Sequence, residues 1–269
     1  MPELPEVETV RRTLESVIQG DEIVAVDYIY TKLITSDLEK FKENIIHQKI
    51  QRIDRMGKYL IFILTDYAMI IHLRMEGKFF IKKDEPVMKH EHIIFHLKSG
   101  NTLRYHDVRK FGTITLHALS DYLTVYPLSD LGKEPKDVQI ESFYQQLQKK
   151  KIAIKSALLD QHIISGLGNI YVDETLFLSK IHPERPADSI TRKEAESLLD
   201  SAIKVLAKAV ELGGTTIRSY TSSLGVSGRF QNELNVHMRK GEPCPRCQTP
   251  IIKLKIGGRG TYVCPKCQH

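Results

Sequence analysis

Near its C-terminus the chain reads Cys244-Pro245-Arg246-Cys247, then sixteen residues, then Cys264-Pro265-Lys266-Cys267, and these are its only four cysteines. Each Cys-x-x-Cys turn can direct two thiolates at one ion. Four thiolates fill a tetrahedral shell and leave no position for water, which is typical of structural zinc. Two disulfides or a redox pair are the alternatives, although the N-terminus has no secretory signal. The spacing predicts one structural Zn²⁺ per chain.

The segment between the two cysteine pairs has the pattern of a β-hairpin. The runs Ile251–Ile256 and Thr261–Val263 flank Gly257-Gly258-Arg259-Gly260. Glycines on both sides of Arg259 allow the backbone to approach a ligand closely while the guanidinium binds a phosphate. We therefore expect a zinc-bound hairpin with Arg259 at its turn.

The positive charge of the chain is concentrated in this region. The formal net charge is +6 and the pI is near 9.0. From Arg229 to His269, eight Lys and Arg residues stand against two Glu, so this segment carries the whole excess. A basic zinc hairpin indicates binding to a phosphate backbone, and a solvated lysine face is the alternative.

Four helices are expected before the hairpin. Thr191 and Glu194 form a capping box, apolar residues follow at helical spacing, and Gly213-Gly214 ends the last helix. The expected ranges are Ile140–Lys149, Ile152–Asp160, Ile170–Lys180 and Thr191–Leu212.

The turn Gly166-Leu167-Gly168-Asn169 precedes one of these helices. Its glycines free backbone N–H groups at a helix N-terminus, where a phosphate can bind, and Asn169 could add a side-chain donor. An ordinary helix–helix connection is the alternative.

The first half of the chain has a different pattern. After a helix over Glu6–Ile18, short strand-like runs are separated by turn residues, which favours a sandwich or barrel. A Pro-, Gly- and Asp-rich linker, Asp121–Asp137, separates these strands from the helices. The expected strands are Ile23–Tyr30, Tyr59–Leu64, Ala68–Leu73, Phe79–Lys82, His92–Leu97, Thr102–Tyr105 and Thr113–Leu116.

The N-terminal residues carry a possible nucleophile. Removal of Met1 would make the secondary amine of Pro2 the chain terminus, and an α-amino group with a pKa of about 7.7–8.0 is partly deprotonated at neutral pH. Glu3 could move the proton. The plain alternative is that Pro and Glu only begin a helix.

Composition excludes a membrane-spanning protein. The hydrophobic content of 41% is enough for a core, but apolar runs such as Tyr59–Leu64 are far below the ~20 residues that a spanning helix needs. We expect a soluble intracellular protein.

Six stretches in order give the chain a resemblance to the formamidopyrimidine-DNA glycosylase family, bacterial enzymes that remove oxidised purines from DNA. They are Pro2–Glu8, Met56–Leu60, His72–Gly77, Asp107–Gly112, Gly166–Glu174 and the zinc hairpin with Gly258–Thr261. The resemblance implies an α+β fold: an N-terminal β-sandwich lobe with an N-terminal helix (1–130), a helix-two-turn-helix lobe (131–235) and a four-cysteine zinc finger (236–269).

The resemblance also implies a reaction. Pro2 would attack C1′ of the damaged nucleotide and form a Schiff base, Glu3 would carry the proton, and Lys58 would contact phosphate and assist catalysis. Elimination of the 3′ and then the 5′ phosphate (β,δ-elimination) would cleave the strand. The enzyme would be a bifunctional glycosylase and lyase of base excision repair, acting on 8-oxoguanine and formamidopyrimidines.

Such an enzyme must flip the nucleotide out of the stack and fill the vacancy. Met75, Arg109 and Phe111 match the family's filling triad: a flexible thioether, a guanidinium for the orphaned cytosine and an aromatic wedge. Further DNA contacts are assigned to His72, Lys155, Asn169 and Arg259, and contacts with the extruded base to Thr215, Thr216, Ile217, Arg218, Ser219 and Tyr220.

Two other functions remain open. An endonuclease VIII-type enzyme shares the Pro2–Glu3 chemistry but prefers oxidised pyrimidines, and a non-catalytic damage-binding protein would keep Pro2 blocked. In either case the expected partner is double-stranded DNA with oxidised bases or abasic sites. The expected state is a monomer in the bacterial cytoplasm, associated with the nucleoid. The residues His237 and Met238 depart from the family, whose members often have Tyr and Gly there.

Overall fold

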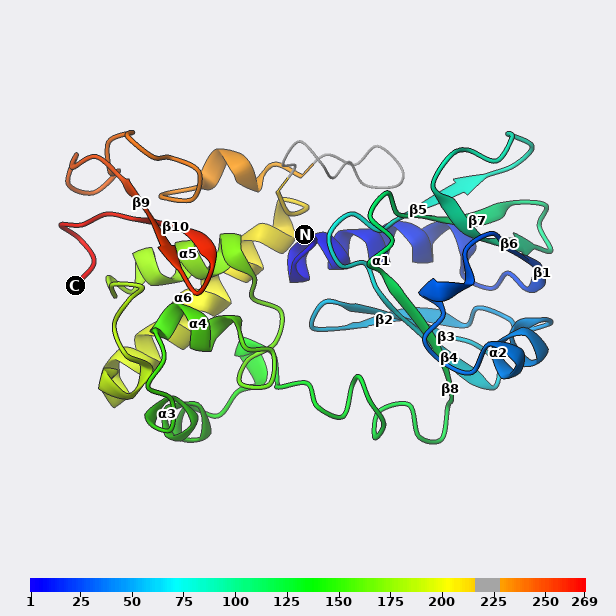
Figure 1. Cartoon of the computed structure of the whole chain (residues 1–269), viewed down its shortest axis with the longest axis horizontal. Helices are drawn as coiled ribbons and strands as arrows, with labels where there is room; N and C mark the ends of the chain where they lie inside the picture. The colour runs from blue at the N-terminus through cyan, green and yellow to red at the C-terminus, as the bar shows by residue number, and fades with distance from the viewer. Residues whose placement is uncertain (216–227) are drawn as a thin grey trace. The chain divides into compact units, whose positions relative to one another are not determined.

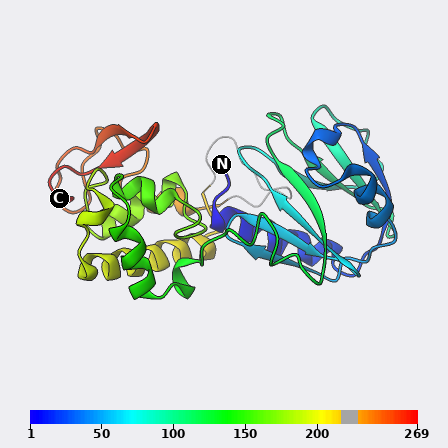
Figure 2. The ribbon, with the colours of Figure 1, turned by 60° about the horizontal axis from the view of Figure 1, so that its bottom comes forward.

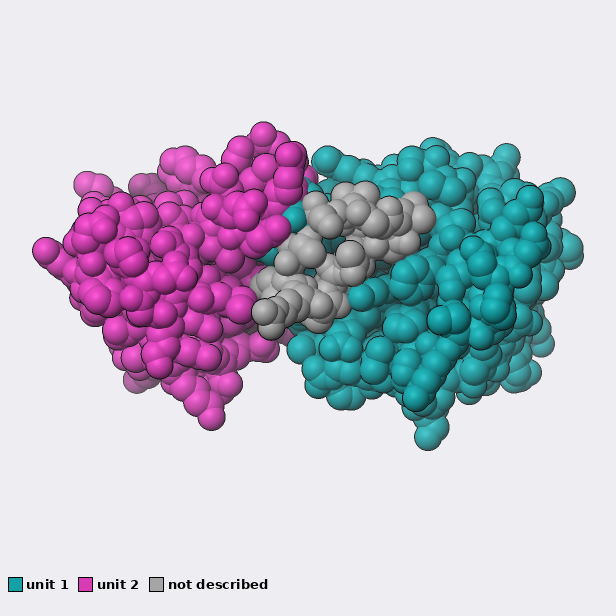
Figure 3. All heavy atoms as spheres, turned by 90° about the horizontal axis from the view of Figure 1, so that it is seen from above, with its two compact units in different colours: residues 1–129, 213–228 teal, residues 130–212, 229–269 magenta. Residues whose placement is uncertain are grey.

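The computed structural model describes residues 1–215 and 228–269. The chain forms two compact units, coloured separately in Figure 3. Unit 1 holds Met1–Ser129 with Gly213–Thr215 and Gly228, and unit 2 holds Asp130–Leu212 and Arg229–His269. The zinc hairpin therefore clusters with the helices.

Unit 1 begins with helix α1 (Leu4–Ile18), as the apolar spacing predicts. Glu3 is its N-cap, and a capping box joins Glu3 and Glu6. Pro5 sits in the first turn, where its missing N–H costs nothing. The apolar stripe of Val7, Val10 and Leu14 is fully buried against the sheets.

Two four-stranded antiparallel sheets follow, with the orders β1-β6-β7-β5 and β2-β3-β4-β8 (Figure 1). Side chains from both sheets and from α1 form one core, so the expected sandwich is confirmed. The strands are β1 (Ile23–Tyr28), β2 (Arg52–Met56), β3 (Tyr59–Ile63), β4 (Tyr67–His72), β5 (Lys78–Lys82), β6 (Glu91–Leu97), β7 (Thr102–His106) and β8 (Thr113–Ala118).

Two elements of unit 1 are additions to the sequence prediction. Strand β2, whose sequence is Arg-Ile-Asp-Arg-Met, has only Ile53 fully buried, so its pattern is too polar to identify. Helix α2 (Leu38–Ile45) buries only Phe41 and Ile45, and Asp37 caps it by accepting a hydrogen bond from the Lys40 N–H.

Unit 2 contains the helices α3 (Ile140–Gln148), α4 (Ile154–Leu159), α5 (Asn169–Leu178) and α6 (Arg192–Glu211), close to the predicted ranges. The capping box of Thr191 and Glu194 is present at the start of α6. Helix α5 is buried around most of its circumference, which suits a central element.

The hairpin of β9 (Ile252–Ile256) and β10 (Arg259–Val263) lies against α5 (Figure 2). Short 3₁₀ turns occur at Thr31–Leu33, Pro135–Asp137, Ala187–Ser189 and Phe230–Glu233. Within the described ranges, no helix combines the length and apolar character needed to cross a bilayer.

Candidate functional site

The first residues of α1 are held in a buried carboxylate cluster. Pro2 and Glu3 are buried, and the N–H of Glu3 donates to Glu6 Oε2 at 2.9 Å. The other oxygen, Glu6 Oε1, accepts from the N–H of Thr215 at 2.7 Å and from its hydroxyl at 3.1 Å. Glu6 thus connects the start of α1 to the segment that follows α6, an interaction that sequence analysis did not anticipate.

Of the six residues assigned to the base-recognition loop, Thr215 is the one within the described structure, and it is 5% exposed. The positions Thr216, Ile217, Arg218, Ser219 and Tyr220 lie outside the described residues.

Lys58 occupies the two-residue turn between β2 and β3, where Met56 pairs with Tyr59. The turn begins with Gly57 at φ 55°, the positive φ that the first central position of such a hairpin requires. Lys58 is only 5% exposed. A tight turn and burial together fix the direction of this lysine.

His72, at the end of β4, is buried and neutral. Burial, with smaller effects of the positive charges of Arg74 and Lys58, lowers the pKa of His72 to about 3. Its Nδ1 accepts a hydrogen bond from the Arg74 N–H at 2.9 Å, which leaves the proton on Nε2. The ring packs edge-on against Tyr59 at 4.6 Å between centroids. His72 can therefore act as a neutral donor and not as a cation.

The three candidate filling residues are exposed in unit 1. Met75 is 37% exposed and Phe111 is 53% exposed. The guanidinium carbon of Arg109 lies 4.7 Å from the centroid of the Phe111 ring. Exposure leaves the Met75 and Phe111 side chains free to contact a partner, as the proposed wedge role requires.

The loop that carries Arg109 and Phe111 is organised by Asp107. This fully buried carboxylate accepts hydrogen bonds from the backbone N–H groups of Arg109 at 3.0 Å and of Phe111 and Gly112 at 2.9 Å. His92 Nε2 lies 2.9 Å from the Asp107 carbonyl oxygen. The backbone of the loop is therefore fixed even though its side chains face solvent.

Tyr105 packs against the Met75 segment and the Arg109–Phe111 loop at the same time. A Cβ placed on Gly77 or on Gly112 would overlap the Tyr105 hydroxyl. Both glycines are needed because only a hydrogen fits between their backbones and this oxygen. Tyr105 thus fixes the spacing of the two segments that carry the filling triad.

In unit 2, Lys155, which the resemblance assigns to a DNA contact, is completely buried. Its Nζ donates to Asp173 Oδ1 at 2.7 Å and to the Gly260 carbonyl oxygen at 3.3 Å, and both ionic side chains are 0% exposed. A phosphate cannot reach this ammonium in the structure. Lys155 instead connects α4 and α5 with the zinc hairpin.

Asn169 lies at the N-terminus of α5 and contacts the same carbonyl. Its Nδ2 donates to the Gly260 oxygen at 3.0 Å. The adjacent residue of the hairpin, Arg259, is exposed. The structure therefore brings Asn169 and Arg259, two of the predicted phosphate contacts, to the same place.

The second oxygen of Asp173 connects to residues further along the chain. Asp173 Oδ2 lies 2.7 Å from His237 Nδ1 and accepts from the Tyr262 N–H at 3.3 Å. The His237 ring packs against Tyr262 at 5.0 Å. His237 therefore has a structural role, since the imidazole satisfies a buried carboxylate.

The four cysteines form one cluster suited to a tetrahedral ion. Their sulfur atoms all lie within 4.8 Å of one another, with Cys244–Cys267 at 3.9 Å and Cys247–Cys264 at 3.5 Å. Sulfur atoms on one Zn²⁺ with bonds near 2.3 Å are about 3.8 Å apart. The distances exceed a disulfide bond of about 2.05 Å and fit the predicted zinc site.

Family models match the chain in three consecutive segments. The formamidopyrimidine-DNA glycosylase N-terminal domain matches residues 1–114, the H2TH domain of the same family matches 131–221, and the zinc finger found in FPG and IleRS matches 241–269. A formamidopyrimidine-DNA glycosylase of Ligilactobacillus salivarius is 49% identical over 272 residues, covering 100% of this chain and 99% of the relative.

The chain belongs to the formamidopyrimidine-DNA glycosylase family. A second family member, from Streptococcus pneumoniae, is also 49% identical over the full chain. Among solved structures, a Lactococcus lactis FPG mutant in complex with Fapy-dG-containing DNA has a TM-score of 0.94 at 43% identity, with both chains fully covered. The L. lactis enzyme with abasic-site DNA has a TM-score of 0.93 at 43% identity.

Four residues that position the candidate site of this glycosylase-family protein could not be identified from the sequence. Three of them contact partners that are distant in the sequence: Glu6, Tyr105 and Asp173. Asp107 contacts backbone N–H groups, which the sequence pattern does not distinguish. An Asp within a Gly-flanked turn is the one local clue, because its carboxylate can accept from N–H groups two to five residues onward.

Proposed function

We propose that this chain is a bifunctional DNA glycosylase and lyase of base excision repair that excises oxidised purines from double-stranded DNA. Proteins that match it along its entire length bear the name formamidopyrimidine-DNA glycosylase, and one structural neighbour was solved with Fapy-dG-containing DNA. The observation that carries the proposal is Pro2–Glu3, buried at the start of α1 in a chain that matches these relatives from end to end.

The proposed chemistry uses the amine of Pro2 after removal of Met1. The nitrogen lone pair attacks C1′ of the damaged nucleotide, the C1′–N9 bond breaks, and the departing base takes a proton. Glu3 carries the proton that opens the sugar ring and leaves an iminium. The iminium acidifies the C2′ hydrogen, so loss of that proton expels the 3′ phosphate, and a second elimination expels the 5′ phosphate.

Two positions in unit 1 support substrate handling in this proposal. Lys58, fixed in its turn, contacts a phosphate near the lesion and assists the eliminations. His72 donates from Nε2 to the backbone as a neutral group, because its pKa of about 3 keeps it uncharged near neutral pH. Met75, Arg109 and Phe111 fill the vacancy left by the flipped nucleotide.

Unit 2 supplies further phosphate contacts, through Asn169 and Arg259. The zinc ion, held by the four cysteines, stabilises the hairpin that carries Arg259 and takes no part in the chemistry. In this proposal the functional segments are 1–130 for catalysis, 131–235 for DNA binding and 236–269 for the zinc finger. The protein acts as a monomer on nucleoid DNA.

Borohydride trapping tests the proposal. Protein without Met1 is incubated with a duplex that contains 8-oxoguanine opposite cytosine, and the Schiff base is reduced to a covalent protein–DNA adduct. We expect an adduct that disappears when Met1 is retained or when Pro2 is changed to Gly with a blocked amine. Trapping mainly with thymine glycol would instead favour the endonuclease VIII type, and tight binding without an adduct would favour a damage-binding protein.

A further inference from the structure

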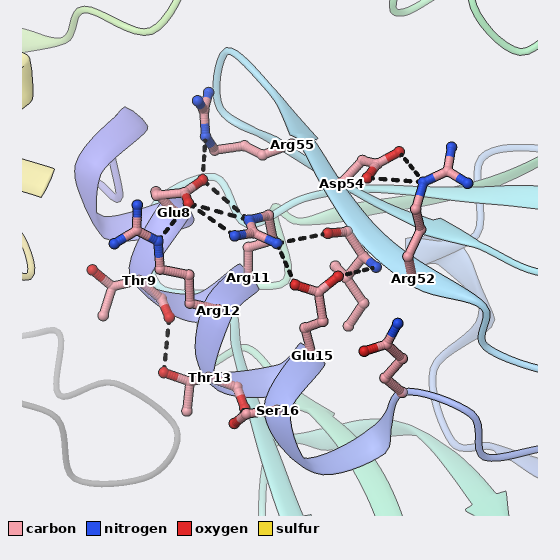
Figure 4. A network of polar contacts seen from close by, with 12 residues as sticks. Glu8, Thr9, Arg11, Arg12, Thr13, Glu15, Ser16, Arg52, Asp54 and Arg55 are labelled. Carbon is pink, nitrogen blue, oxygen red and sulfur yellow. Dashed lines mark hydrogen bonds and ion pairs between the residues drawn. The ribbon is translucent and has the colours of Figure 1, made fainter.

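A single buried carboxylate on α1, that of Glu8, receives three guanidinium groups (Figure 4). Arg11 donates from Nε and Nη2 at 3.1–3.2 Å, Arg12 donates from Nε at 2.7 Å, and Arg55 donates from Nε at 3.0 Å. The side chains of Glu8 and Arg55 are 12% and 10% exposed. Hydrogen bonds of this kind between ions are about twice as strong as neutral ones.

Arg11 and Glu15 fix α1 to the free edge of strand β2. The sheet order places β2 at an edge, where backbone groups lack a neighbouring strand. Arg11 Nη1 donates to the Ile53 carbonyl oxygen at 3.0 Å, and the Ile53 N–H donates to Glu15 Oε1 at 3.1 Å. Arg11 Nη1 also pairs with Glu15 Oε2 at 2.6 Å. The helix therefore takes the place of the missing strand at Ile53.

Arg55 extends this attachment to the turn that carries Lys58. Its Nη1 donates to the Gly57 carbonyl oxygen at 3.0 Å while its Nε donates to Glu8. The Gly57 carbonyl belongs to the peptide bond that enters Lys58, so this one guanidinium connects α1 with that turn. Glu8 follows the N-cap residue Glu3 by five residues, which corresponds to about 7.5 Å along the axis of α1.

We propose that Glu8 and Arg55 are positioning residues that hold the Lys58 turn in fixed register with the Pro2–Glu3 end of α1. The proposal rests on the proposed function, because it assigns these two residues to the placement of groups that act on the DNA. A planar guanidinium is required, since it offers two separate N–H groups to two acceptors at once. A displacement of about 1 Å at a reacting group can cost about 10²-fold in rate.

The test compares Arg55→Met with Arg55→Lys in the Met1-processed full chain. Glu8 keeps Arg11 and Arg12 in either variant, so its buried charge stays compensated and the protein remains folded. The matched control is Arg52→Met, on the same strand. Its side chain is 52% exposed and, among the residues that the structure describes, pairs only with Asp54. Single-turnover trapping rates and duplex affinity are measured for each, with thermal unfolding as the check on folding.

We expect Arg55→Met to lower the single-turnover rate by about 10- to 100-fold with little change in affinity. Arg55→Lys should recover part of the loss, because one ammonium can pair with Glu8 but cannot also reach the Gly57 carbonyl. Glu8→Gln combined with Arg55→Met should be no slower than Arg55→Met alone if the two residues act as one unit.

An Arg55→Met rate equal to that of Arg52→Met would overturn the proposal. So would a lowered melting temperature with an unchanged rate per folded molecule, because Arg55 would then be only structural. If the parent protein itself forms no adduct, the proposed function fails and the positioning role fails with it. An active parent with an unaffected Arg55→Met variant rejects the positioning role alone.

Discussion

The carboxylate of Asp107 accepts a hydrogen bond from the backbone N–H of Phe111 at 2.9 Å, and Asp107 is completely buried while Phe111 is half exposed. The pair combines a rigid backbone with a side chain that is free to contact a partner. A side chain that separates stacked bases needs this combination, because a loop with a mobile backbone would move away from the bases and leave them stacked.

Replacement of Asp107 by Ala should loosen this loop. Three N–H groups lose their acceptor. The hydrogen bond from Gly112 is buried and the other two are partly buried, and a buried unsatisfied group costs about 1–3 kcal/mol. We expect a lower melting temperature and a larger relative loss of activity on 8-oxoguanine duplexes than on single-stranded abasic DNA, which needs no wedge. Val108→Ala, at an exposed position of the same loop, is the control and should change neither quantity.

The contact of Tyr105 with two glycines predicts a selective rescue. Gly112→Ala should destabilise the protein because the new Cβ overlaps the Tyr105 hydroxyl. Tyr105→Phe should restore only part of the stability, because it removes that oxygen but keeps the ring carbon Cζ at 2.8 Å, a side-chain atom that can shift. Gly77→Ala should not be rescued in this way, since its Cβ would also lie 2.6 Å from the Leu73 carbonyl oxygen. Denaturant unfolding of the single and double variants measures the stability that Tyr105→Phe restores to each alanine variant. Equal recovery of stability in the Gly112→Ala and Gly77→Ala proteins would contradict the packing described.

Lys155 and Arg259 should differ in how salt affects their variants. Arg259→Met removes the proposed phosphate contact, so the slope of log affinity against log salt should become shallower by about one. Lys155→Met leaves Asp173 short of a buried partner and should cost about 3–5 kcal/mol of stability, with the salt slope of the remaining folded protein unchanged. A reduced slope for Lys155→Met would restore its assignment as a direct contact.

The pKa of His72 predicts a dependence of stability on pH. The folded protein holds His72 neutral down to a pKa of about 3, whereas the unfolded chain binds a proton near pH 6.5. The contribution of His72 is therefore most favourable above pH 6.5 and declines as the pH falls, by up to about 1.4 kcal/mol per pH unit. His72→Asn, whose Oδ1 can replace Nδ1 as acceptor for Arg74, should show a weaker decline between pH 7 and 5 in urea unfolding. An identical decline of stability with falling pH in the parent and the variant would show that groups other than His72 cause the pH dependence.

Removal of the metal should unfold the hairpin. A chelator that competes for zinc should release one Zn²⁺ per chain and weaken duplex binding, because the four cysteines hold together the segment that carries Arg259. Cys267→Ser should have the same effect without chelator. Restoration of binding by added Zn²⁺ is the control, and full DNA affinity in metal-free protein would exclude a structural role for the ion.

Local patterns predict much of this fold. The stripe of α1, the capping box of α6 and the cysteine spacing each depend on residues close together in the chain, and all three are present. Strand β2 escaped prediction because α1, and not a second strand, satisfies its outer edge through charged side chains. The polar residues of β2, such as Arg55, which contacts α1, remove the apolar alternation by which a strand is predicted from sequence.

The positions of candidate site residues were less predictable than their types. Arg109, Phe111 and Asn169 could be named from sequence motifs. The three-dimensional structure was needed to find the Asp107 carboxylate that fixes the Phe111 loop. It was also needed to find the Gly260 carbonyl oxygen that Asn169 and Lys155 share. Lys155 shows the reason most clearly. The resemblance assigns this lysine to a DNA contact, and only its contact with Asp173 reveals a buried ion pair.

The wide separation of the partners of Asp173 along the chain affects how unit 2 is made. Tyr262 follows Asp173 by 89 residues, so at about 5–20 residues per second a ribosome delivers it roughly 4–18 s later. Throughout that interval the nascent helices expose a carboxylate and apolar surface that belong in the interior. Unit 2 therefore completes its interior only after the cysteine hairpin emerges, which places the last step of its folding at the end of translation.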